Sequence, residues 1–156
     1  MRPKYLTITL IITAVFQFIA FEIHAGSTSR DVIKMETKAY SSRTKGIVTF
    51  NHKHHQTDYK QKFPGLYKAE CGECHHDQSH KLLVNLKEGD NVQKCIECHK
   101  KPGFMQGKKA KGLSAEQKRE YHANALHDNC KSCHKTVNKK TGKKAAPVAC
   151  KSCHGK

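Results

Sequence analysis

The sequence predicts one small domain whose core cannot be built from its own side chains. Three observations carry this prediction. Residues 26–156 are numerous enough for a single domain. Only 18 of these 131 residues are Leu, Ile, Val or Phe, a share that in a highly charged chain is typical of disorder. All eight cysteines stand in C-x-x-C-H motifs. The chain therefore needs a bound apolar group to fold around.

The four motifs share one signature and follow one another along the chain. They are Cys71-Gly-Glu-Cys74-His75, Cys95-Ile-Glu-Cys98-His99, Cys130-Lys-Ser-Cys133-His134 and Cys150-Lys-Ser-Cys153-His154, here numbered sites 1 to 4. In this signature two thiols form thioethers with porphyrin vinyl groups, and the adjacent imidazole ligates the iron. The sequence therefore predicts four covalently bound haem c groups. Their flat apolar faces would form the core.

Other uses of paired cysteines fit this spacing only in part. Two C-x-x-C pairs twenty residues apart are also found in zinc sites, and an exported chain could form four disulfides. Neither requires a histidine after every pair. A thioredoxin-like pair would lie in a βαβ pattern, which this sequence does not show. The four histidines favour haem attachment.

The N-terminus has the pattern of a secretory signal. Arg2 and Lys4 precede an apolar run that ends shortly before Ala25. We expect residues 1–25 to be removed, and export to be periplasmic through the Sec route because no twin arginine is present. The apolar run is shorter than a spanning helix needs. An uncleaved anchor is the alternative, and only then would the protein be held at a membrane.

Positive charge is concentrated in the C-terminal part of the chain. Residues 26–99 carry 12 basic and 9 acidic side chains, whereas residues 100–156 carry 15 and 3. Such a surface can steer an acidic partner, although lysine-rich tracts also serve solubility alone. Nucleic acid is not an expected partner, because the exported chain lacks basic motifs interleaved with aromatic residues.

Local patterns predict little regular structure. Residues 26–46 are polar and predict a flexible lead-in, followed by a domain over 47–156. Alternation over Ile47 to His52 predicts a short strand. Ser114 and Gln117 predict a capping box that opens a helix running to about Asp128. A lysine-rich loop is expected over residues 136–149. On the predicted helix, the histidines at 122 and 127 lie about 140° apart around the axis.

The sequence also contains enough histidines to give every haem iron a second protein ligand. Besides His24 and the four motif histidines there are seven, namely His52, His54, His55, His76, His80, His122 and His127. Four are needed for bis-histidine ligation, which lacks the axial methionine that raises potential and leaves no position for a substrate. Low-potential electron transfer is therefore favoured, with no catalytic residue. The alternative is a multihaem reductase of metal ions or oxyanions, in which one iron has no distal protein ligand.

The order of these features resembles a known family. Phe50, His52 and His55, then the first motif with His76 directly after it, then three further motifs, resemble the class III cytochromes c, the tetrahaem cytochromes c3 of anaerobic bacteria. The resemblance covers about residues 47–156. It implies a small multihaem cytochrome c fold that is mostly irregular, with a few helices and a short N-terminal β-hairpin around four haems. The bridge between His55 and Cys71 and the linker 100–112 are longer than in compact members, which leaves the subfamily open.

The resemblance also implies ligands and partners. The implied pairs, distal ligand first, are His52 with His75, His76 with His99, His55 with His134, and His127 with His154. His54, His80 and His122 receive no ligand role, although His54 remains an alternative to its neighbour His55. A monomeric carrier in anaerobic respiration is implied, exchanging electrons with acidic redox proteins such as hydrogenase or a membrane-bound multihaem cytochrome complex.

Overall fold

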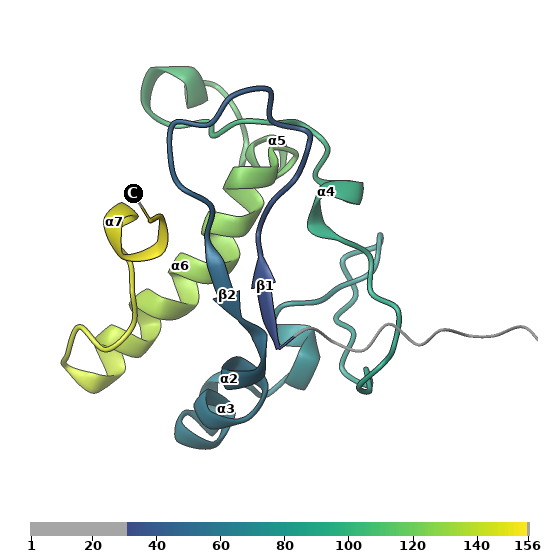
Figure 1. Cartoon of the computed structure of the whole chain (residues 1–156), viewed down its shortest axis with the longest axis vertical. Coiled ribbons are helices and arrows are strands. Elements are labelled where there is room, and N and C mark those ends of the chain that lie inside the picture. The colour runs from purple at the N-terminus through teal and green to yellow at the C-terminus, as the bar shows by residue number, and fades with distance from the viewer. Residues whose placement is uncertain (1–30, 156) are drawn as a thin grey trace, which may run out of the picture.

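The computed structural model describes residues 31–155 (Figure 1). The predicted signal segment 1–25 and the first residues of the predicted lead-in lie outside the described residues. Within 31–155, no helix has both the length and the apolar character needed to cross a membrane.

A two-stranded antiparallel sheet joins the start of the described chain to the first predicted ligands. β1 (Val32–Lys34) pairs with β2 (Thr49–Asn51), and Ile33 lies opposite Phe50. This small sheet agrees with the expected N-terminal β-structure. However, β1 lies inside the segment predicted to be a flexible lead-in, so the lead-in contributes one strand to the fold. β2 is shorter than the predicted strand at both ends: Val48 bridges His154 instead, and the Asn51 side chain caps the helix that begins at His52.

Short helices connect β2 to the first motif. They are α2 (His52–Gln56), α3 (Asp58–Lys62), and the 3-10 turns η1 (Pro64–Leu66) and η2 (Glu70–Glu73). The Asn51 side-chain oxygen accepts a 3.0 Å hydrogen bond from the His54 backbone N–H at the start of α2. Helices this short are marginal by themselves. Their positions therefore depend on contacts with the rest of the molecule.

Segment 82–84 packs directly onto the first motif. Gly72 is buried, and a Cβ atom there would lie 2.9 Å from Leu82 Cβ and 3.1 Å from Val84 Cγ1. Only glycine fits at this point without movement of the neighbouring segment. The second motif then forms α4 (Cys95–Cys98), and η3 (Gly107–Ala110) lies in the basic linker that follows.

The capping box is confirmed, but the predicted single helix is wrong. Ser114 Oγ accepts from the Gln117 backbone N–H at 3.2 Å, and Gln117 accepts in return from the Ser114 N–H at 2.8 Å. The helix it opens, α5 (Ala115–Arg119), is only one turn long. The chain is extended at Tyr121, because the His122 N–H donates to the Lys101 carbonyl at 2.9 Å and the Lys101 N–H donates to the Glu120 carbonyl at 3.1 Å. This pairing ends α5.

A second and much longer helix begins after this break. α6 (His122–Thr141) has 20 residues, is about 30 Å long and contains the third motif. Figure 1 shows it as the longest helical ribbon of the molecule. The loop predicted from residue 136 begins instead after Gly142, which ends the helix in the left-handed conformation at φ +64°. The Asn138 side chain bonds both backbone groups of Ala146 at 2.8 and 3.0 Å. It thereby folds the loop back onto the helix before α7 (Cys150–Cys153).

Side chains alone form almost no core in the described part of the chain. Val137 is the one buried apolar residue among residues 31–155, whereas Val32, Leu82 and Val84 are exposed by 43 to 50%. Such an arrangement agrees with the prediction that the chain cannot supply its own core. The haem core itself remains a prediction.

Candidate haem-binding sites

Each motif is one helical turn. The backbone N–H of the motif histidine donates to the carbonyl of the first cysteine at 2.9 Å in site 1 and at 2.8 Å in sites 2 and 4. The motif of site 3 lies within α6. Residues three apart on a helical turn share one face. Each turn therefore presents two thiols side by side and carries the imidazole next to them.

The structure brings the motif histidines opposite the predicted distal histidines. Ring centres are 6.2 Å apart for His52 and His75, 6.1 Å for His76 and His99, 6.3 Å for His55 and His134, and 6.1 Å for His127 and His154. With a metal–nitrogen bond of about 2 Å and about 1.1 Å from nitrogen to ring centre, two imidazoles on opposite sides of one metal have centres about 6.2 Å apart. The donor set and its spacing fit an iron porphyrin at each motif. The ligand roles themselves stay predictions.

Backbone carbonyls orient five of these eight imidazoles. The bonds join Nδ1 of His55 to Asn51, of His76 to Asp77, of His99 to Arg119, of His134 to Pro147 and of His154 to Gly46, at 2.5 to 2.8 Å. A carbonyl oxygen can only accept, so Nδ1 carries the proton and the lone pair is at Nε2. This tautomer is the one that a ligating histidine needs.

The four sites differ in these bonds. Both imidazoles of site 2 and both of site 3 donate to a carbonyl. In site 4 His154 does so, but Nδ1 of His127 is buried with no hydrogen-bond partner among the described residues. Nδ1 of His52, in site 1, is buried and unpartnered in the same way. Each of these two rings instead meets a phenylalanine edge-on, at 4.5 Å for Phe104 and His127 and 5.9 Å for Phe50 and His52.

Burial favours the neutral form of four of the predicted ligands. Desolvation lowers the pKa of His52, His55, His75 and His127 below the ordinary histidine value. A neutral imidazole has a free lone pair for a metal, whereas a protonated one has none. These side chains are therefore ready to ligate at neutral pH.

The cysteine pairs of different motifs lie near one another. All eight thiols are free. Burial, reinforced by the neighbouring thiols of Cys130 and Cys133, raises the pKa of Cys74 to about 11. Burial likewise raises the pKa of Cys130, followed by the influence of Cys95 and Cys153. Within residues 31–155 no three His, Cys, Asp or Glu side chains gather to hold one metal ion.

The other three histidines of the described chain have different surroundings. His54 Nδ1 lies 3.2 Å from Asp58 Oδ2 at the surface, so it is His55 that the structure places opposite His134. His80 stacks against His76 with ring centres 5.5 Å apart. His122 is buried, and its Nδ1 lies 3.1 Å from the Tyr40 hydroxyl. No local pattern predicts that last contact, because its partners are 82 residues apart.

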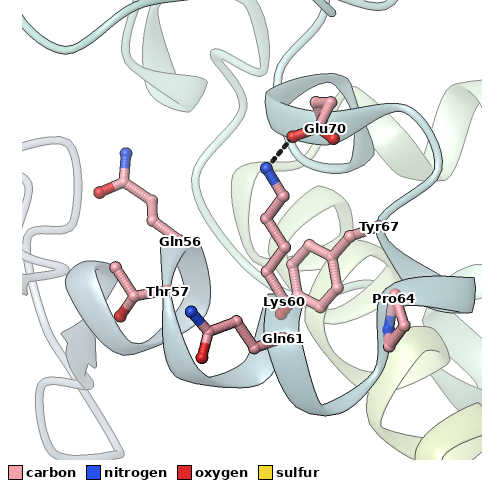
Figure 2. Close-up of a pocket in the computed structure, with 7 residues that line it drawn as sticks. All are labelled: Gln56, Thr57, Lys60, Gln61, Pro64, Tyr67 and Glu70. Atoms are coloured by element: carbon pink, nitrogen blue, oxygen red, sulfur yellow. Dashed lines mark hydrogen bonds and ion pairs between the residues drawn. The ribbon is translucent and has the colours of Figure 1, made fainter.

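A surface hollow of about 360 Å³ lies beside the sites rather than in them. It is lined by residues of α2, α3, η1 and η2, and an ion pair between Lys60 and Glu70 spans one side (Figure 2). None of its lining residues is a cysteine or histidine. Burial, and next the nearby Cys133, raise the pKa of its Tyr67 to about 12. The hollow therefore borders the thiols through Tyr67 without containing a predicted ligand.

Haem-attachment turns that each face a second histidine define a c-type cytochrome with several haems. The family model described as the class III cytochrome c family matches residues 28–154. Because this match spans most of the chain, the protein belongs to the class III cytochrome c family, whose members are electron-transfer proteins with covalently bound c-type haems. No curated protein and no solved structure matches the chain.

Proposed function

We propose that this protein is a periplasmic, low-potential electron carrier with four covalently attached bis-histidine haems. The observation that carries the proposal is that all four motif histidines face a second histidine, at 6.1 to 6.3 Å between ring centres. A c-type haem supplies one-electron exchange at its iron. Two imidazoles at every iron leave no position for a substrate, so this arrangement favours a carrier over a reductase.

The chain's own residues would attach, ligate and orient. At each site the two cysteines would hold the group covalently, and the two imidazoles would ligate its iron. Carbonyls such as those of Asn51 and Arg119 hold Nδ1–H and so keep Nε2 free for the metal. Histidine at both positions, without an axial methionine, supports low potentials. The neighbouring thiols of Cys74 and Cys130 support close spacing of the groups and electron passage between them.

The basic C-terminal part supports an acidic partner, such as hydrogenase or a membrane-bound multihaem cytochrome complex. Lys140, Lys143, Lys144 and Lys151 are exposed around site 4, and none forms an ion pair with another described residue. Their charge is therefore available to a partner. Such attraction guides encounter and weakens as salt screens it.

The spectrum of the purified ferric protein tests this function. We expect a purely low-spin spectrum, a mass that corresponds to four haems, and no change on adding carbon monoxide to the reduced protein. A high-spin band, or binding of carbon monoxide, would support the reductase alternative instead. A mass corresponding to fewer haems would contradict the tetrahaem assignment.

A further inference from the structure

Site 4 depends on one hydrogen bond for the orientation of its imidazoles. The His154 Nδ1–H donates to the Gly46 carbonyl at 2.8 Å, across 108 residues of sequence. The opposite ring, His127, has a buried Nδ1 with no partner within the described chain. Sites 2 and 3 have two such bonds each, so the loss of one leaves another. In site 4 the loss of its one bond would leave neither imidazole bonded to a carbonyl.

The backbone at Gly46 passes so close to the backbone of Gly155 that only glycine fits there. A Cβ atom on Gly46 would collide with the Gly155 carbonyl oxygen and lie 2.9 Å from the carbonyl carbon. Both obstacles are backbone atoms, which cannot rotate away as a flexible side chain can. Two residues on, Val48 forms an antiparallel bridge with His154, so both sides of the contact are held in place.

We propose that Gly46 is a positioning residue for site 4, whose missing side chain lets its carbonyl accept the Nδ1–H of His154 and so keeps the potential of that site low. The inference rests on the proposed function. An imidazole that donates its second N–H becomes a more basic ligand. A more basic ligand stabilises ferric over ferrous iron, because the ferric ion has the higher charge. Without the bond, the potential of site 4 rises.

Residues close to Gly46 in the sequence contribute to two further sites. The carbonyl of Asn51, five residues on, accepts from Nδ1–H of His55 of site 3 at 2.8 Å, and His52 faces His75 of site 1. Residues 46–55 thus reach three of the four sites. Within this segment, the Gly46 carbonyl is the group that accepts the Nδ1–H of the site 4 imidazole.

The test is Gly46→Ala in the holoprotein with all haems attached, followed by NMR-monitored redox titration of each haem. We expect the potential of site 4 to rise and the other three to stay unchanged. Removal of an outer-shell partner changes metal affinity by roughly tenfold or more. A tenfold change in the ratio of ferric to ferrous affinity corresponds to about 59 mV for one electron.

The matched control is Gly155→Ala. Its Cβ would meet nothing within 4 Å, although Gly155 is the other partner of the same contact. We expect no shift at any site. An unshifted site 4 in Gly46→Ala, or an equal shift at all four sites, would overturn the proposal.

A second measurement decides the matter if Gly46→Ala does not accumulate. In the wild-type holoprotein the Nδ1 proton of His154 should exchange slowly with deuterium, and fast exchange would overturn the proposal. Failure of the proposed function looks different. It would give a high-spin signal in the wild-type spectrum, whereas failure of this inference leaves a low-spin spectrum and an unmoved potential.

Discussion

Residues 46–55, here called the ligand segment, and helix α6 both serve several sites, yet they are built in opposite ways. The ligand segment is ten residues of strand and short helix, and it supplies His52, His55 and two orienting carbonyls. Helix α6 is twenty residues long and supplies His127 together with the whole motif of site 3. The ligand segment brings its histidines to the sites through short turns, whereas α6 serves two sites because it is long.

The difference lies in what fixes each region. Helix α6 satisfies its own backbone along most of its length and ends at a left-handed glycine. The ligand segment is held by groups far away in the sequence, namely His154 and strand β1. Local sequence therefore determines α6, whereas contacts with distant residues determine the ligand segment.

The largest expected effect is that of removing the haems. We predict that protein expressed without the attachment machinery has no cooperative fold, because the buried apolar side chains of the described chain are too few to offset chain entropy. Far-UV circular dichroism with thermal melting measures this. Residual helix, if any, should come from α6 and melt without a sharp transition. A cooperative transition in the apoprotein would contradict this prediction, because the ligand segment would then be folded without haems.

Exchange of one axial ligand on α6 comes next. We predict that His127→Met raises the potential of site 4 by on the order of 100 mV, since a thioether replaces an imidazole. His122→Met is the control on the same helix, because the His122 ring contacts Tyr40 rather than His154. Redox titration of both variants measures the shift. If His122→Met moved the potential of site 4 and His127→Met did not, the helix face assigned to the ligand would be wrong.

The same exchange in the ligand segment separates two adjacent histidines. His55→Met should raise the potential of site 3 by a similar amount, on the order of 100 mV. His54→Met should leave all four potentials unchanged, because His54 pairs with Asp58 at the surface. Titration of the two variants side by side decides between the neighbours. A shift at site 3 in His54→Met alone would assign the ligand to His54.

The contrast between local and distant contacts also explains how much of the sites the sequence predicts. The motif signature identifies the attachment turns because each lies within five consecutive residues. The distal histidines came from the family pattern, and the structure places those same histidines opposite the motifs. No local signal points to the Gly46 carbonyl, which lies 108 residues from its partner.

The fold shows the same limit. The capping box at Ser114 is local and was predicted correctly. The break at Tyr121 was missed, because it depends on backbone pairing with Lys101, twenty residues earlier. Strand β1 was missed because its three residues, Val32 to Lys34, give a pattern only when they pair with β2. Local hydrogen bonds are visible in the sequence, whereas distant ones are not.

The smallest expected effect is on encounter with a partner, and it compares the lysines beyond α6 with those before the ligand segment. Lys143, Lys144 and Lys151 lie in the loop and motif of site 4, and all three are exposed. We predict that reversing their charge slows reduction by hydrogenase by about tenfold at low salt. The matched control reverses Lys34, Lys38 and Lys45, which are equally many and also exposed. The measurement is the second-order rate across a range of ionic strength.

Salt separates steering from a change in the sites themselves. The screening length is about 10 Å at 0.1 M salt, so the rates of variant and wild type should converge as salt rises, while the four potentials stay unchanged. A rate that stayed slow at high salt would indicate damage to site 4 rather than lost attraction. Equal slowing by the control set would place docking on both regions, and slowing by the control set alone would move it to the ligand segment. If only the reversal of Lys143, Lys144 and Lys151 slows the reaction, and only at low salt, then electrons enter the protein at site 4.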